Sequence, residues 1–315
     1  MNGFGNDFER DVQYTAPSEG KGRRVLLALG ASAGWLALYF GLRFTLSMVL
    51  VMAYYFMGFL KFGYDMTKII NWVAVEKIAE VSFLEIIFST VSFFAAVWIV
   101  GLIRDRRKPA ELRVGFFRDT GFVRFSPALI PILLIMGFSL NMFVSLLFEV
   151  LPIPAELLED YANESSLLGE FSVLSVLATA IFAPLSEELI FRGLLISRMR
   201  RGVPLWLAVL IPSLIFGLIH GQILWICYAF MLGLLLSLIC LRAHSTAASA
   251  LLHMAFNASS FALPFIPIPE DSPKSTIYTL FAVSGVVSIA MIAVMLLLTQ
   301  KKKATMTLKR RRLYE

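Results

Sequence analysis

The sequence is poor in cysteine, in histidine and in charge. Its 315 residues include 2 cysteines and 3 histidines, and 16% are charged, against about 25% in typical soluble domains. Cys227 and Cys240 share one apolar segment and lie too far apart along a helix to bond to each other. We expect both to be small buried residues. No zinc-finger spacing, Gly-rich phosphate loop, heptad array or internal repeat is present.

Apolar residues take the place of the missing charge. They make up 58% of the chain, above the roughly 45–50% of soluble proteins, and the mean hydropathy is +0.77. These values predict a multi-pass integral membrane protein. Measured against about 20 apolar residues per crossing, the hydrophobic runs give eight spans, near 25–59, 82–103, 127–151, 171–197, 204–220, 223–241, 245–265 and 277–299. The first run is long enough for a tilted helix and an interfacial turn around Arg43.

We therefore predict an all-α fold, a polytopic helical bundle of about eight transmembrane helices in a single membrane domain over 23–300. Residues 1–22 are polar and lack apolar periodicity, which indicates a disordered cytoplasmic tail. The run behind this tail is far longer than the core of a signal peptide, about 7–15 residues, so the tail is not a cleaved signal. Residues 301–315 form a basic cytoplasmic tail.

The distribution of charge predicts the topology. The net charge is +6, and the bases flank hydrophobic runs in short blocks: 21–24, 104–108, 198–201 and 301–312. The connection 152–170 instead carries five acidic residues and no base. By the positive-inside rule both termini are cytoplasmic and this connection is a loop on the outer side, most simply of the plasma membrane. Basic blocks beside spans indicate contact with the lipid bilayer and no role in nucleic-acid binding.

A few charged side chains fall inside the hydrophobic segments, where charge is costly and marks a functional site by default. They occur as Glu187, Glu188 and Arg192; as His220 after Phe216; and as His253 before Asn257. Residues four apart share one face of a helix. We therefore expect Glu188 to form an ion pair with Arg192, and His253 to act together with Asn257.

This set of side chains can carry out acid–base chemistry on water. Adjacent residues of a helix point about 100° apart, so one glutamate can face a site while the other pairs with Arg192. A carboxylate packed in an apolar bundle suits a general base, and we expect Pro184 to kink or break the helix and admit water. Each group also has an ordinary interpretation: solvated charges at a helix end, core histidines, and Asn257 as a bridge between helices. Three further polar residues are interpreted as packing or snorkelling groups: Glu85, Asn141 and Glu149.

The ordered motifs Glu-Glu-x-x-x-Arg, Phe-x-x-x-His and His-x-x-x-Asn resemble the signature of the CPBP family. This family includes the type II CAAX prenyl endopeptidases and bacterial bacteriocin-processing and immunity (Abi) proteins. The resemblance covers about residues 125–265. It implies an eight-helix bundle with a polar intramembrane catalytic cavity open toward the cytoplasmic side, and intramembrane endopeptidase activity.

The resemblance also implies roles for single residues. Glu187 and His220 would activate the attacking water, and His253 and Asn257 would bind the tetrahedral oxyanion. The supporting residues would be Glu188, Arg192 and Phe216. The substrate would be a peptide or protein, with membrane-bound and prenylated ones included.

Three alternatives remain open at this stage. Glu187, His220 and His253 could hold zinc or another divalent metal as a His₂Glu site, although the helix motif His-Glu-x-x-His is missing; a glutamate-based protease is favoured. The same buried charges could relay protons in a proton-coupled transporter, for which no inverted repeat is visible. The chain could also be a catalytically silent membrane scaffold.

Overall fold

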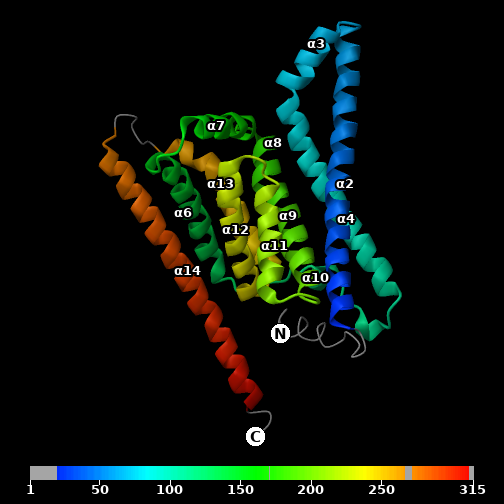
Figure 1. Cartoon of the computed structure of the whole chain (residues 1–315), viewed down its shortest axis with the longest axis vertical. Helices are drawn as coiled ribbons and strands as arrows, with labels where there is room; N and C mark the ends of the chain where they lie inside the picture. The colour runs from blue at the N-terminus through cyan, green and yellow to red at the C-terminus, as the bar shows by residue number, and fades with distance from the viewer. Residues whose placement is uncertain (1–19, 170, 267–271, 312–315) are drawn as a thin grey trace.

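The computed structural model describes residues 20–169, 171–266 and 272–311, and the regular elements within them are all helices (Figure 1). Six helices in this described part of the chain are long and apolar enough to cross a membrane. They are α2 (Lys21–Phe62), α4 (Ile78–Arg106), α6 (Leu129–Val150), the continuous helix Val173–Met199, α12 (Ile223–Ala243) and the Lys274–Gln300 part of α14 (Lys274–Arg311). The predicted polytopic helical bundle is therefore confirmed.

The predicted number of eight crossings stays a prediction. The two remaining runs form helices of 14 and 17 residues, α11 (Leu205–Leu218) and α13 (Thr246–Ala262). Both are shorter than the roughly 20 residues that a perpendicular crossing needs. They nevertheless lie inside the bundle, where α11 packs on α12, and α13 on α6.

The prediction of an interfacial turn around Arg43 was wrong. α2 is one helix of 42 residues that runs through Arg43 without interruption. Its apolar stretch has no proline and many good helix formers, so nothing ends the helix before Gly63, whose φ of 64° is a left-handed conformation that favours glycine. Beyond α3 (Met66–Asn71), α4 returns beside α2, and the two helices form a hairpin at one side of the molecule (Figure 1).

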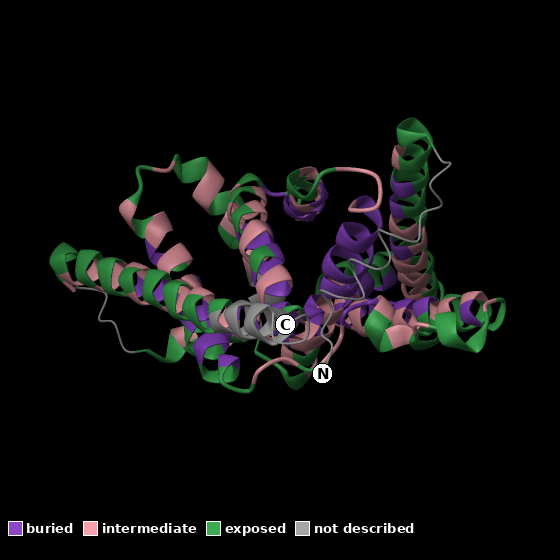
Figure 2. Cartoon of the chain, turned by 90° about the horizontal axis from the view of Figure 1, so that it is seen from below, coloured by how far each residue is buried: buried purple, intermediate pink, exposed green. Residues whose placement is uncertain are grey.

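The centre of the bundle is the helix Val173–Met199. In its most apolar stretch 44% of the residues are buried, against 17% in the corresponding stretches of α2 and α14. Figure 2 shows the same contrast, with the buried residues gathered in the middle and the flanking helices largely exposed. The exposed apolar faces of these flanking helices are suited to contact lipid. Cys240 is buried as predicted, whereas Cys227 lies exposed on α12, which corrects that expectation.

The acidic connection is not the loop that we predicted. It contains α7 (Ala155–Gly169), which lies across the end of the bundle opposite to the start of α2 and the end of α14 (Figure 1). The acidic side chains Glu156, Glu159, Asp160 and Glu164 are exposed. The inner face rests on α12, where the Tyr161 and Trp225 rings meet edge to face at 5.8 Å. This amphipathic division explains why a polar segment forms a helix here.

Both predicted tails fall partly outside the described residues. Residues 1–19 and 312–315 are not described, and α2 begins at Lys21. α14 continues as a helix to Arg311, through most of the segment predicted as the basic tail. The domain boundaries therefore remain predictions.

The separation of α7 from the basic blocks leads to a topological test. In a Cys227→Ala, Cys240→Ala background, an impermeant thiol reagent added to intact cells should label Asn163→Cys in α7 and spare Arg107→Cys at the end of α4. Both positions are exposed, so the difference would report the side of the membrane. The reverse labelling pattern would overturn the proposed orientation, and labelling of both after permeabilisation is the control.

At the basic end, one carboxylate joins three helices. Asp119, in α5 (Phe116–Asp119), accepts hydrogen bonds from Arg104 Nη1 of α4 and from Arg198 Nη2 of α10 (Ser197–Met199), each at 2.7 Å. Burial alone would raise the pKa of Asp119, but the Arg198 and Arg104 guanidinium groups outweigh it and hold this pKa below the usual value.

A lowered pKa makes the stability that Asp119 contributes dependent on pH. The contribution should be complete above the unfolded-state pKa of about 3.9 and be lost as the pH falls through the lower folded-state value. Thermal unfolding in detergent should show this acid-side loss for the wild type and a smaller one for Asp119→Asn. At neutral pH the variant should be less stable by about 1.5–3 kcal/mol, because two charge-assisted hydrogen bonds are weakened. Equal acid sensitivity of the two proteins would contradict the assignment.

Candidate active site

The first motif lies on a helix with unusual winding. Ser172 caps its start by accepting a hydrogen bond from the Ser175 N–H at 3.0 Å. Two π-helical segments, η3 (Val176–Phe182) and η4 (Leu189–Ile196), flank the short α9 (Ala183–Glu188) that carries both glutamates. We expected Pro184 to kink or break the helix, but the helix continues through this residue. It lies where η3 passes into α9, so the missing N–H is accommodated by a change of winding. Such π segments are rare and occur often at functional sites.

Glu188 is the centre of the buried charges. It is fully buried, and its Oε1 accepts a hydrogen bond from Arg192 Nη1 at 2.6 Å, which is the ion pair that the spacing predicted. The same oxygen lies 3.1 Å from His253 Nδ1. Arg192 also donates from Nη2 to the Gly233 carbonyl of α12 at 3.1 Å. One carboxylate thus ties the first motif to the third, and its partner arginine ties it to α12.

Glu187 faces the other side of the same histidine. Its Oε2 lies 3.6 Å from His253 Nε2, and its side chain keeps 12% exposure where Glu188 has none. The two adjacent glutamates therefore divide their positions as the helix geometry predicted. Glu188 is locked by Arg192, and Glu187 is the accessible carboxylate.

His220 joins this cluster through Phe216. The buried Phe216 ring meets the His253 ring at 5.6 Å and the His220 ring at 5.0 Å, both edge to face. The Arg192 guanidinium lies over the same phenyl ring, 4.8 Å from its centre. Within the described residues, no ion pair joins His220 to a carboxylate.

The surroundings of His220 correct one prediction. The side chain was expected inside an apolar helix, but α11 ends at Leu218 and His220 lies half-buried in the following turn. The turn closes at Gly221, whose φ of 77° explains the glycine there. Gln222 then caps α12, because its Oε1 accepts from the Leu224 and Trp225 N–H groups.

A hydrogen bond back to α11 selects the tautomer of the His220 ring. His220 Nδ1 lies 2.7 Å from the Phe216 carbonyl oxygen, which can only accept. Nδ1 must therefore carry the proton, and in the neutral ring Nε2 is left with its lone pair. His220 can thus accept a proton from a reacting group at Nε2.

Asn257 is one helical turn beyond His253 on α13. Its side-chain amide donates to the Thr179 carbonyl in η3 at 2.9 Å, so it also ties α13 to the first motif helix. The amide has a second N–H that this bond does not use. Asn141 has the packing role that we expected for it, since it donates to the Phe256 carbonyl and to Ser260, each at 2.9 Å.

The roles of three residues on α2 and α4 escaped the sequence reasoning. Arg43 of α2 forms an ion pair with Glu85 of α4 at 2.8 Å, so Glu85 is not the isolated packing group that we expected. The buried Tyr39, one turn before Arg43 on α2, packs in the same core cluster as Leu189 and Ile190, directly after the two glutamates. An arginine in one predicted span and a glutamate in the next was the available signal.

The described residues do not fit the three-ligand metal site. They contain no group of three or more His, Cys, Asp and Glu side chains that could hold a metal ion. Glu187 and His253 lie close together, whereas His220 contacts this pair through the Phe216 ring and joins no carboxylate among the described residues.

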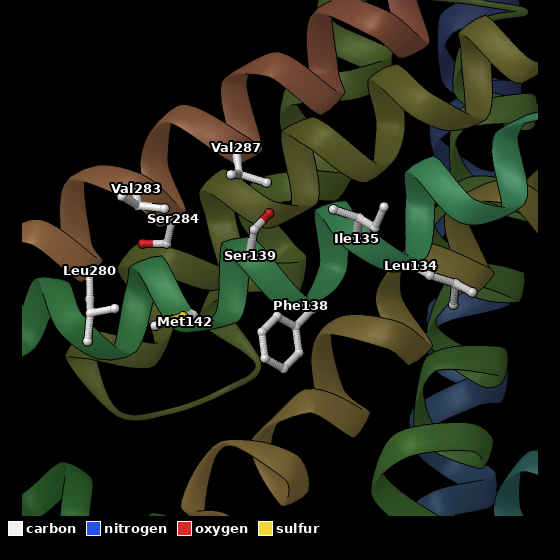
Figure 3. A pocket seen from close by; sticks show the side chains of 9 residues that line it. All are labelled: Leu134, Ile135, Phe138, Ser139, Met142, Leu280, Val283, Ser284 and Val287. Carbon is white, nitrogen blue, oxygen red and sulfur yellow. The ribbon is translucent and has the colours of Figure 1, made fainter. Parts of the chain in front are cut away.

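An apolar pocket of about 450 Å³ lies elsewhere, between α6 and α14 (Figure 3). Its lining consists of aliphatic, aromatic and Met side chains with two serines, Ser139 and Ser284. Both hydroxyls donate to carbonyls of their own helices. None of the candidate catalytic residues lines this pocket, so it is not the predicted polar cavity, which stays a prediction.

Comparison with known proteins matches the segment that holds all three motifs. Residues 169–259 match the family described as type II CAAX prenyl endopeptidase Rce1-like. An uncharacterised 24.3 kDa protein of Escherichia coli is 35% identical over 118 residues, which cover 35% of this chain and 53% of that protein. The chain thus spans about half the length of this curated relative. No solved structure matches the chain.

The family match and the geometry concern the same helices. The matched segment runs from just before the first motif helix to just beyond Asn257, and it includes α11 and α12. Residues 169–259 are thus similar to a type II CAAX prenyl endopeptidase Rce1-like domain, which is consistent with the CPBP family that the three motifs indicated.

Proposed function

We propose that this protein is an intramembrane endopeptidase of the CAAX protease type, in which Glu187 and His220 activate a water molecule. The observation that carries the proposal is the position of His253 between two carboxylates, 3.1 Å from Glu188 and 3.6 Å from Glu187. Glu188 is neutralised by Arg192, and Glu187 is left as the base.

The reaction needs one proton acceptor and one proton donor. Glu187 takes a proton from water as the oxygen attacks the carbonyl carbon of the peptide bond, which forms a tetrahedral intermediate. The protonated Glu187 then gives this proton to the leaving nitrogen as the C–N bond breaks. His220 accepts at Nε2 and so helps to orient the same water. Acid–base catalysis of this kind contributes about 10²–10⁴-fold to a rate.

The developing oxyanion needs hydrogen-bond donors, which His253 and Asn257 supply in this proposal. His253 already directs Nδ1–H to Glu188, so a second donation from Nε2 requires the imidazolium form. Its positive charge would then lie between two carboxylates. Asn257 offers the N–H that Thr179 leaves free.

The role of Asn257 can be tested by truncation. Asn257→Ala should lower kcat by about 10²–10³-fold with little change in KM, because an oxyanion donor acts mainly in the transition state. The partner of Asn257 is the backbone carbonyl of Thr179, which no side-chain substitution of Thr179 would remove. The matched control is therefore Asn141→Ala, which removes another bridge from a side-chain amide to α13. A loss of stability with unchanged kcat in Asn257→Ala would identify it as a bridge between helices only.

The glutamate-based mechanism and the metal alternative differ in their response to chelation. We expect 1,10-phenanthroline to leave hydrolysis unchanged at concentrations that inhibit a zinc protease control. Inhibition that added zinc reverses would replace the glutamate mechanism with a metal-dependent one.

The experiment that tests the function is hydrolysis by the purified full chain in detergent. The probes are a quenched fluorescent peptide with a farnesylated cysteine four residues from its C-terminus, the same peptide without the farnesyl group, and a mixed-sequence peptide library. Cleavage that Glu187→Gln abolishes is expected. Cleavage of only the prenylated peptide would define a prenyl-protein substrate, and cleavage of the others a broader one.

Failure of all probes would favour the other two functions. A proton-coupled transporter would acidify the interior of proteoliposomes in a Glu187-dependent way. A scaffold would neither hydrolyse peptides nor transport protons. We place the protein in the plasma membrane with both termini in the cytoplasm, as the basic blocks suggest.

A further inference from the structure

A bidentate ion pair connects α2 with α4 beside the first motif helix. Arg43 Nε donates to Glu85 Oε1 at 3.1 Å, and Nη2 donates to Oε2 at 2.8 Å. Glu85 is buried, with 7% of its surface exposed. The third nitrogen, Nη1, lies 3.5 Å from the Tyr39 hydroxyl. Two parallel bonds to one carboxylate fix the plane of the guanidinium as well as its position.

Tyr39 attaches this pair to the catalytic helix. Its ring is buried in the same core cluster as Leu189 and Ile190, which follow the two glutamates directly, and it meets Phe93 of α4 edge to face at 5.1 Å. α4 also touches the first motif helix through Thr90, which donates to the Phe182 carbonyl at 3.1 Å. The α2–α4 hairpin is therefore packed directly against the helix that carries Glu187.

The hairpin packs on the part of the helix that carries Glu187. α4 contacts α9, which holds both glutamates, and α2 contacts η4, which follows them. Among the described residues, Glu188 is paired with Arg192, whereas Glu187 has no Arg or Lys partner of its own and approaches only His253. A guanidinium held by two bonds to Glu85 lacks the mobility of a free arginine, so the hairpin presents a fixed surface to this helix.

We propose that Arg43, held by Glu85 and Tyr39, is a positioning residue that keeps the Glu187 carboxylate oriented toward His253. The active site would then extend beyond the matched segment 169–259 and be completed by the α2–α4 hairpin. This inference rests on the proposed function.

The decisive variant removes both charges at once. Arg43→Gln/Glu85→Gln leaves no unpaired charge in the interior, so the fold should survive. If Arg43 only joins α2 to α4, this variant should keep the wild-type kcat. If Arg43 positions Glu187, kcat should fall at least 10-fold with KM nearly unchanged, since a misplacement of about 1 Å can cost about 10²-fold. Arg43→Lys, which keeps the cation and loses the bidentate geometry, should recover part of the loss.

The control is another α4 ion pair, Lys77–Glu80 at 2.7 Å, near the start of the helix. Lys77→Gln/Glu80→Gln should keep the wild-type kcat. If the Arg43→Gln/Glu85→Gln variant does not fold, the Arg43→Lys variant provides the test. A kcat of Arg43→Lys equal to that of the wild type would then overturn the inference. A full kcat in the neutral variant, together with an inactive Glu187→Gln, would overturn this inference alone. Full activity of Glu187→Gln, or no hydrolysis by the wild type, would overturn the proposed function and this inference with it.

Discussion

Glu187→Ala and His220→Ala should each remove most peptide hydrolysis, and the double variant should be scarcely slower than either single variant. The reason is that base and partner act on one water, so the loss of either disables the same step. Catalytic groups that act as a unit give grossly non-additive losses. We expect each single loss to reach about 10²–10⁴-fold in kcat.

The measurement is kcat for the four proteins of this double-mutant cycle, which are the wild type, the two single variants and the double variant. The melting temperature of each in detergent is measured as well. Glu149→Ala is the matched control, since Glu149 is an exposed glutamate near the end of α6. It should hydrolyse as the wild type does. Additive losses, with the double variant slower by the product of the two factors, would mean that His220 acts separately from Glu187. In that case His220 would be connected to His253 only through its contact with the Phe216 ring.

The local part of the site could be predicted from the sequence. A four-residue spacing forces Glu188 and Arg192 onto one helix face, so their ion pair needs no tertiary information. The adjacent position of Glu187 then follows from the 100° rotation per residue. Even the change to π winding after α9 left this contact in place, because the long arginine side chain tolerates a small shift.

The long-range part could not be predicted in the same way. α2 and α4 are apolar around their whole circumference, so no periodic pattern shows which face carries Arg43 or Glu85 toward the bundle. The turn at His220 depends on a single glycine with positive φ, a feature that a hydropathy window averages away. The acidic α7 was missed because its helix gains stability from docking on α12.

Arg192→Ala should lower the stability of the folded protein as well as its activity. Arg192 and Glu188 have almost no exposed surface, so the truncation leaves the Glu188 carboxylate buried beside His253 without its cation. Breaking a buried pair by removing one partner typically costs about 3–5 kcal/mol. The variant also loses the hydrogen bond to the Gly233 carbonyl and the contact with the Phe216 ring. The melting temperature in detergent should therefore fall clearly below that of the wild type.

Two variants show whether the buried charge is the cause. Glu188→Gln/Arg192→Met removes both charges and fills much of the same volume, so it should be more stable than Arg192→Ala although inactive. Lys77→Ala breaks an ion pair whose side chains are 33% and 40% exposed, and exposed pairs contribute about 0–1 kcal/mol. An Arg192→Ala protein that melts like the wild type but does not hydrolyse peptide would require a different role. Arg192 would then contact the substrate or the oxyanion, and the connection between the first motif and α12 would depend on packing alone.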